Sequence, residues 1–243
     1  MKKTILIFTS ATFFFITLII IYLSVFGYET EKLNSLLENK VKSNFSNTNV
    51  DLKKIKIKIN VKNLSFFATT YEPSIQYYNN KFNLNKIDAY INLKSLLIGK
   101  PKIENVRILS NETDIVEFKK LIRYFKPSNF KKFVLNDIEK GKIIFNLELN
   151  FLDNEIKNYE IDGIVKNLFA RAQNIIIKKS SFIYSIKKNG GEIDNIRGLV
   201  NGFQINSGNI KFTNLKSLEI NGNLNSELNL NKSDIDIFVD KKI

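Results

Sequence analysis

The pattern of hydrophobic and polar residues starts with one unbroken apolar run. Lys2 and Lys3 precede the stretch from Thr4 to Phe26, which contains no charged residue. About 23 residues at roughly 1.5 Å per residue span ~35 Å, enough to cross the hydrocarbon core of a bilayer. The run therefore predicts a transmembrane helix, and the two preceding lysines put the N-terminus in the cytoplasm by the positive-inside rule.

A cleaved signal peptide is the alternative interpretation of this run. Val25-Phe26-Gly27 could act as a weak cleavage site. The apolar regions of signal peptides cover roughly 7–15 residues, however, and this run is much longer. We therefore expect residues 1–27 to be the cytoplasmic N-terminus and an uncleaved signal anchor. Under either interpretation the rest of the chain lies outside the cytoplasm.

Residues 28–48 form the next segment, a short amphipathic helix followed by a linker. The helix is expected from Tyr28 to Phe45, near the lipid headgroups, because the apolar residues of this stretch fall on one helical face. These residues are Leu33, Leu36, Leu37, Val41 and Phe45.

From residue 49 to residue 243 the hydrophobic period changes to two, which predicts a single β domain. Apolar and polar residues alternate from Leu52 to Lys62 and from Ile87 to Lys94. Such alternation is typical of strands with one apolar and one solvated face. Gly190-Gly191 is the clearest hairpin signal. Further candidate strands cover residues 102–109, 142–151, 159–168, 172–178, 182–187, 192–199, 202–206, 218–225 and 235–239.

One helix interrupts the strands. The stretch from Glu112 to Phe125 places Ile115, Phe118 and Ile122 on one face, and Lys126-Pro127 ends it. The predicted fold class is therefore mainly β, an antiparallel sheet with an N-terminal transmembrane helix and one or two short helices.

The alternation continues where the sequence stops. Leu alternates with small polar residues from Asn221 to Asn231, so the sheet is expected to present an open edge there. We expect a β-rich protein partner or self-association through the segment from Leu218 to Val239, or a domain that begins a longer array.

Alternating strands must hide their apolar face, and two arrangements do so. Two sheets can pack face to face as a sandwich, in which inward Ile, Leu and Phe cover each other. A curled sheet can instead leave an apolar groove that accepts acyl chains. Periodicity alone favours the sandwich.

Composition excludes the enzyme sites that depend on histidine or cysteine. The chain has no His and no Cys, so Ser-His-Asp triads, Cys-His pairs and zinc sites with such ligands are excluded. Carboxylate-only chemistry stays open. Asp234, Asp236 and Asp240 lack the glycine and closing glutamate of a calcium loop. We expect no enzyme activity, no catalytic residues, no cofactor and no metal site.

The formal charge of +13 would suit nucleic acid or an anionic membrane as a partner, but Lys, Asn and Ile are abundant throughout, which favours lysine simply as the default surface charge of this sequence. An extracytoplasmic chain does not meet nucleic acid, so we expect none as a partner. Lys53, Lys54, Lys56 and Lys58 follow the anchor closely. They either meet headgroups of the outer leaflet or form the solvated face of a strand.

Two segments resemble the N-terminal part of AsmA-like proteins, the group that includes AsmA, TamB and the YhdP-type proteins. One is the anchor, short helix and basic strand through Leu64. The other is a strand from Ile87, the sequence Ser95-Leu96-Leu97, then Gly99-Lys100 and a second strand from Ile103 to Leu109. Together they cover about the first half of the chain, and YhdP-like and TamB-like members are several times longer.

The resemblance implies a single-pass protein of the bacterial inner membrane with most of the chain in the periplasm. It also implies a curled sheet with a groove that binds or conducts phospholipid between inner and outer membranes, and so contributes to outer-membrane biogenesis. The residues expected to face lipid are Ile57, Ile59, Ile91, Leu93, Phe145 and Leu147. Two alternatives stay open: an assembly factor that pairs through an open β edge, and a component of lipopolysaccharide export similar to LptC.

Overall fold

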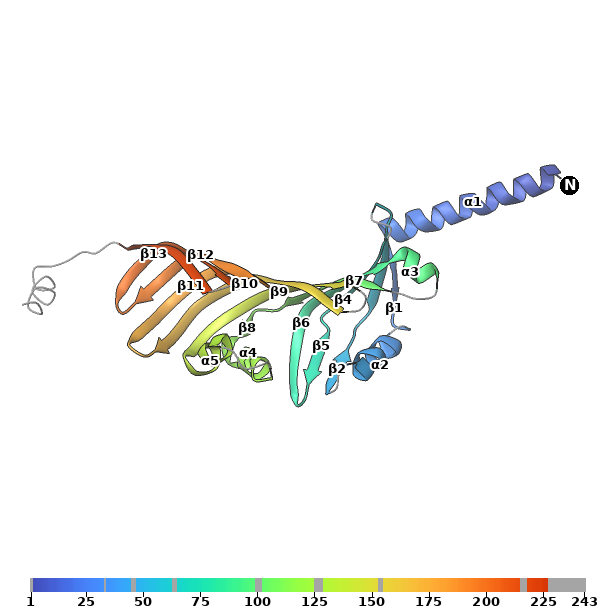
Figure 1. The fold of residues 1–243 in the computed structure, drawn as a ribbon. Helices are drawn as coiled ribbons and strands as arrows, with labels where there is room; N and C mark the ends of the chain where they lie inside the picture. Colours follow the sequence, from blue (N-terminus) through green and yellow to red (C-terminus); the bar gives the residue numbers. More distant parts are fainter. Residues whose placement is uncertain are drawn as a thin grey trace, which may run out of the picture. The chain divides into compact units, whose positions relative to one another are not determined.

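The computed structural model describes residues 2–32, 34–44, 47–62, 65–98, 102–124, 129–152, 155–214 and 218–226. The chain divides into two compact units. The anchor unit is Met1–Asn111 with Phe145–Ile161, and the second unit is Glu112–Ile144 with Asp162–Ile243. The predicted class is confirmed: a long apolar helix precedes a 14-stranded antiparallel sheet (Figure 1).

The apolar run forms helix α1, Lys2–Val25. Its segment Lys3–Val25 has a mean hydropathy of 2.4 and is not buried by the rest of the protein. It is long and apolar enough to cross a membrane, although an N-terminal signal sequence would meet the same criteria. Gly27 follows two residues after the helix with a φ of +76°, which suits glycine, and Lys58 Nζ donates to Val25 O at 3.1 Å.

The segment after the anchor differs from the prediction. Residues Tyr28–Thr30 form strand β1, and the helix α2 begins only at Asn34 and ends at Asn44. β1 is extended because it pairs with a distant strand, β3 (Ile55–Asn60), with Tyr28 opposite Ile57. This tertiary pairing overrides the local helical pattern. Leu33 and Phe45 lie outside the described residues.

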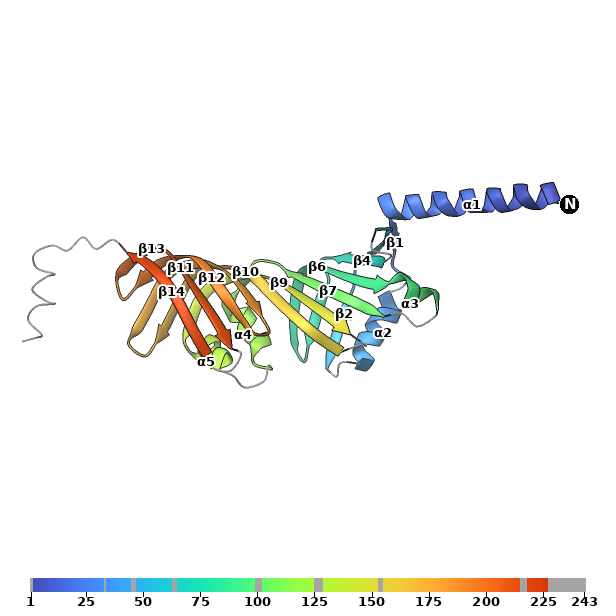
Figure 2. The ribbon, with the colours of Figure 1, turned by 45° about the horizontal axis from the view of Figure 1, so that its top comes forward.

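The strands of the anchor unit form a hydrogen-bonded series (Figure 2). The order is β1, β3, β4, β6 and β7, followed by β9. Two further strands lie outside this order: β2 pairs with β5, and β5 pairs with β6. The bounds are β2 Thr48–Asp51, β4 Ser65–Tyr71, β5 Ser74–Tyr77, β6 Asn80–Asn92, β7 Ile103–Ser110 and β9 Ile138–Leu152.

A short helix, α3 (Leu93–Leu97), follows β6 where the sequence predicted the end of a strand and a turn. Asn92 Oδ1 accepts a hydrogen bond from Ser95 N at 2.9 Å, as helix-capping side chains do. Ser95 Oγ in turn accepts from Lys102 N at 2.9 Å. The cap starts a helical turn at Leu93. Gly99 and Lys100 lie outside the described residues.

In the second unit, two helices pack near the start of β9. α4 spans Ile115–Ile122 and α5 spans Asn129–Asn136; β8 (Thr113–Asp114) pairs with β9. The predicted helix is thus confirmed in its middle part. It begins at Ile115 because Asp114 caps it, accepting from Val116 N at 2.8 Å. α5 was not predicted, and Phe125 and Lys126-Pro127 lie outside the described residues.

The remaining strands complete the second unit in sequential order. They are β10 Glu155–Ala172, which starts in the anchor unit, β11 Ile175–Lys187, β12 Gly190–Val200, β13 Phe203–Asn214 and β14 Leu218–Ser226. The hairpin at Gly190-Gly191 is confirmed, with Lys187 opposite Gly190. The strand predicted at residues 235–239 lies outside the described residues, as do Asp234, Asp236 and Asp240.

Single extra residues interrupt the alternation in these strands. Asn167, Lys179 and Asn195 have φ values of 51°, 50° and 54°. The register of β11 with β12 shifts around the last two. Such β-bulges let the same face stay buried beyond the extra residue. In β10, for example, the buried positions step from Val165 to Leu168.

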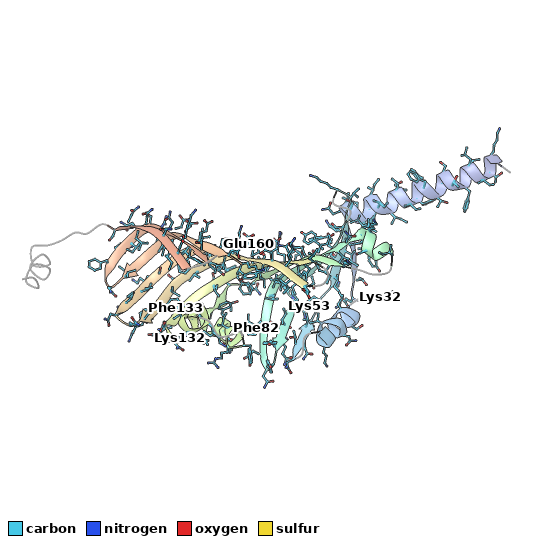
Figure 3. All side chains as sticks on the ribbon, viewed as in Figure 1. Lys32, Lys53, Phe82, Lys132, Phe133 and Glu160 are labelled. Atoms are coloured by element: carbon cyan, nitrogen blue, oxygen red, sulfur yellow. The ribbon has the colours of Figure 1, made fainter. Side chains whose placement is uncertain are left out.

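Strong curling, which the resemblance implied, is not observed in the sheet of either unit (Figures 1 and 2). In the anchor unit the pairs β3–β4, β4–β6 and β7–β9 run without any register shift. Register shifts, which bend a sheet locally, occur in this unit between β6 and β7, near Leu84 and Tyr90. Side chains line the strands on both faces (Figure 3).

Candidate functional site: the apolar face of the anchor unit

The strand register gathers most of the aliphatic side chains of the anchor-unit strands on one sheet face, because directly opposite residues share a face, while the Phe67 and Tyr90 rings pack together on the other face. We call the aliphatic surface the apolar face. One row across the strands is Ile57, Ala68, Ala89, Val106 and Leu149. The neighbouring rows are Ile55, Thr70, Ile87, Ile108 and Leu147 on one side, and Ile59, Phe66, Ile91 and Ile103 on the other.

The apolar face is only partly covered by the described part of the chain. Ile55 and Thr70 are buried, Ile103 is exposed, and the other residues of the three rows are half-buried. A sandwich core would leave them inaccessible to solvent. The face therefore retains accessible apolar surface across five strands.

Four of the residues predicted to face lipid lie in these rows, namely Ile57, Ile59, Ile91 and Leu147. Phe145 lies two residues before Leu147 on β9 and so shares its face by alternation. Leu93 is the first residue of α3 and does not continue the β6 alternation. The sequence prediction omitted Ala89, Val106 and Leu149, although the alternation in their strands contained the signal.

The opposite face of the anchor unit carries a row of polar residues. Glu29, Lys56, Thr69, Asp88, Arg107 and Glu148 lie opposite one another in that order on six strands. We call this row the charge ladder. Lys56 Nζ lies 3.3 Å from Glu29 Oε1, Thr69 Oγ1 donates to Asp88 at 2.8 Å, and Arg107 lies 3.0 Å from Glu148 Oε2.

The ladder shifts the acid–base equilibria of its members. The hydrogen bond from Arg107, together with one from Asn105 at 2.7 Å, lowers the pKa of the Glu148 carboxyl despite partial burial. The same contact raises the pKa of Arg107. Asp88 is buried, and Lys86 Nζ pairs with it at 2.7 Å. The ladder therefore places complementary charges opposite one another on neighbouring strands.

In the second unit the register also places apolar residues opposite one another on neighbouring strands. Ile193 lies opposite Tyr184 and Ile210, and Phe212 opposite Ile220. α4 and α5 contribute buried Ile115, Ile122 and Val134 to the core of this unit. Burial raises the pKa of the Tyr184 phenol, whose Oη donates to Ile144 O at 3.3 Å. Ile220 is 63% exposed, so the core of this unit does not extend over all of these residues.

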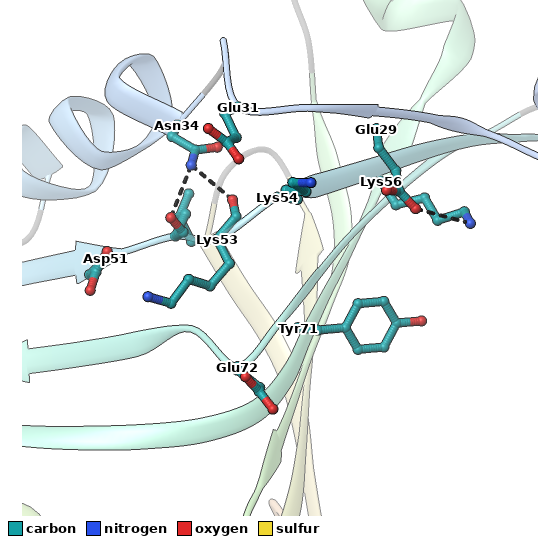
Figure 4. Close-up of a pocket in the computed structure, with 10 residues that line it drawn as sticks. Glu29, Glu31, Asn34, Asp51, Lys53, Lys54, Lys56, Tyr71 and Glu72 are labelled. Carbon is teal, nitrogen blue, oxygen red and sulfur yellow. Dashed lines mark hydrogen bonds and ion pairs between the residues drawn. The ribbon is translucent and has the colours of Figure 1, made fainter.

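A charged pocket of about 620 Å³ lies beside β1 in the anchor unit (Figure 4). Asn34 shapes its wall, because Nδ2 donates to Leu52 O at 2.9 Å and to Lys53 O at 2.8 Å. The charged side chains around it are Glu29, Glu31, Asp51, Glu72, Lys53, Lys54 and Lys56. Three of the four lysines that follow the anchor in sequence are thus brought together with four carboxylates.

Among the described residues no three Asp, Glu, His or Cys side chains form a group that could hold a metal ion. No family model, no curated protein and no solved structure matches this chain. The likeness to AsmA-like proteins therefore rests on the sequence pattern alone.

Proposed function

We propose that this protein is an AsmA-like, membrane-anchored periplasmic protein that binds phospholipid through the acyl chains and conducts it between the inner and outer membranes. The single observation that carries the proposal is the apolar face of the anchor unit, whose three in-register rows stay largely half-buried. Contiguous accessible apolar surface of this kind marks a binding surface for apolar partners.

Acyl chains suit this surface for a physical reason. Burial of apolar groups is favourable by about 0.8 kcal/mol per methylene and needs no directional contact. A sheet face built from Ile, Leu, Val, Ala and Phe offers such burial along its strands. No catalysis is required, which agrees with a chain that lacks His and Cys.

The sequence before and within α1 supports the inner-membrane location. Lys2 and Lys3 favour a cytoplasmic N-terminus, and α1 is long and apolar enough to remain as an anchor. The charged pocket begins at Glu29, four residues after α1, a distance of at most ~14 Å along the chain. We place it near the headgroups, where its mixture of carboxylates and amines favours a zwitterionic headgroup over a purely anionic one.

Site-specific photo-crosslinking in the native membrane tests lipid binding. A photoreactive benzophenone residue at Ile59 or Leu147 should capture radiolabelled phospholipid, because both side chains lie on the apolar face. The matched controls lie on the opposite face: Asn60, the residue after Ile59, and Asn146, the residue before Leu147. We expect at least several-fold more lipid at the apolar positions.

Equal capture at apolar-face and opposite-face positions would remove the support for a lipid-binding face. Capture of protein instead of lipid at Ile59 and Leu147 would favour a covering partner, and the sandwich would then be the better account.

A second candidate function is assembly through an open β edge. β14 ends the strand order, and among the described residues it pairs only with β13. Its Ile220 and Leu224 are exposed. Lysine at both positions should block strand addition, since inward charges protect edges. Light scattering would show the change from dimer to monomer, and an unchanged monomer in both proteins would exclude self-association through β14. Leu228 and the residues to Val239 lie outside the described part.

A further inference from the structure

Two hairpin turns of the second unit are hydrogen-bonded to each other. The β10–β11 turn contains Asn174, and the β12–β13 turn contains Asn201. Asn201 N donates to Ile176 O at 2.8 Å, Ile176 N donates to Asn201 Oδ1 at 2.7 Å, and Asn201 Nδ2 donates to Asn174 O at 3.1 Å. These bonds make residues 173–179 and 199–204 one structured element, which we call the double-turn tip.

The double-turn tip exposes large apolar side chains. Ile175, Phe203 and Ile176 are 50%, 39% and 36% exposed. Consecutive residues of a strand point to opposite faces, so Ile175 and Ile176 place apolar surface on both faces of the tip. A notch of about 510 Å³ lies beside them, and Ile176 and Leu199 form its apolar walls.

The charge of the tip is entirely positive. Lys178 and Lys179 are exposed, and Lys178 lies opposite Leu199 and lines the notch. Neither residues 173–179 nor residues 199–204 include Asp or Glu, and no acidic residue occurs from Gly163 to Gly191. Apolar groups at a projecting end, flanked by lysine, are the composition of segments that lie in a bilayer interface.

We infer that the double-turn tip inserts shallowly into the surface of an anionic phospholipid bilayer. Ile175, Ile176 and Phe203 enter the boundary of headgroups and acyl chains, and the two lysines pair with lipid phosphates. A bilayer fits better than a folded protein, because it surrounds a projecting tip and so covers both faces, whereas a protein surface would cover one. This contact does not depend on the proposed lipid binding by the anchor unit.

The absence of Trp from the chain allows a direct test. In the full chain held in a non-ionic amphipathic polymer, Phe203→Trp places the only tryptophan of the chain at the tip, and its emission can be excited selectively at wavelengths that tyrosine does not absorb. With vesicles containing about one third phosphatidylglycerol, we expect a blue shift of its emission and quenching by brominated acyl chains. Neutral phosphatidylcholine vesicles should give a much smaller effect. Ile220→Trp, on β14 of the same unit, is the matched control and should not respond.

A second pair of variants separates the charge from the apolar contact. Lys178→Gln with Lys179→Gln should weaken vesicle co-flotation at least several-fold and remove its sensitivity to salt, while Ile175→Ser should weaken it without changing that sensitivity. Lys187→Gln with Lys188→Gln, at the other end of β11, should have little effect. Circular dichroism confirms folding of each variant.

An unshifted Phe203→Trp emission in anionic vesicles, or equal effects of the two lysine pairs, would overturn the inference. An emission shift that depends on protein concentration without vesicles would assign the tip to a contact between two copies instead.

Discussion

At the scale of single residues, complementary charges lie opposite one another across the strands of the anchor unit. The charge ladder aligns Lys56 with Glu29, and Arg107 with both Asp88 and Glu148. A slip of one position would place these charges on the apolar face and the isoleucines in water. The ladder thus reinforces the choice that the hydrophobic pattern already makes.

Glu148→Gln tests the ladder through its pH dependence. Because Arg107 lowers the pKa of Glu148 in the folded chain, its stabilising effect is complete above the unfolded pKa of ~4.3 and is lost as the pH falls through the lower folded value. The variant should be less stable by about 1 kcal/mol at neutral pH and should lose less stability on acidification. Urea unfolding of both proteins at neutral pH and at acidic pH measures this difference in the free energy of unfolding.

The exposed pair of Glu117 and Lys120 on α4 provides the control, and Glu117→Gln should change little. A stability difference between wild type and Glu148→Gln that is independent of pH would mean that the carboxylate acts through packing alone.

A second single residue, Gly27, connects the anchor helix to the first strand of the sheet. A Cβ there would lie 2.8 Å from Ile57 O, and the φ of +76° is unfavourable for other residues. Gly27→Ala should destabilise the β1–β3 pairing by about 1–3 kcal/mol, seen as faster hydrogen exchange at Tyr28–Thr30. Gly202 has a comparable φ of +90°, but a Cβ added there would meet no atom within 4 Å. Gly202→Ala therefore measures the cost of backbone strain alone, in the β12–β13 turn.

At the scale of secondary-structure elements, the helices of the second unit supply core that strands alone do not. Lys119 Nζ of α4 donates to Leu135 O at 2.9 Å and also to Ile138 O, which ties α4 to the end of α5 and the start of β9. Ile115 and Ile122 on the apolar side of α4 are buried. The two helices are therefore part of the folding unit.

Ile122→Ala measures that contribution. The Ile122 side chain is 1% exposed, so its truncation should cost about 2–5 kcal/mol in urea unfolding. Val116→Ala on the same helix removes a side chain that is 51% exposed and should cost less than about 1 kcal/mol. Similar losses in both variants would show that α4 contributes helix propensity and little burial.

At the scale of the whole molecule, the proposed topology has a simple chemical test, because the chain has no cysteine. Asn189→Cys lies in the exposed β11–β12 turn and should react with a membrane-impermeant maleimide on cells whose outer membrane alone is opened. Lys3→Cys should react only after the inner membrane is permeabilised. Labelling of Lys3→Cys on the intact chain also shows that the anchor is retained.

Labelling of Lys3→Cys before the inner membrane is permeabilised would show that the orientation of the anchor is the reverse of the proposed one. Loss of that cysteine from the mature chain, with Asn189→Cys still labelled, would identify a cleaved signal peptide and leave the remaining fold unchanged.

The sequence by itself determined the fold class, the apolar helix, the hairpin at Gly190 and five residues of the apolar face. These features follow from local rules: hydrophobic length, a period of two and the conformational freedom of glycine. Only the tertiary structure decided that Tyr28–Thr30 is a strand, because its partner Ile55–Ile57 lies about 27 residues away, beyond the reach of local patterns. It also decided the alignment of the charge ladder and the fastening of the double-turn tip, since both depend on which strands pair and in which register.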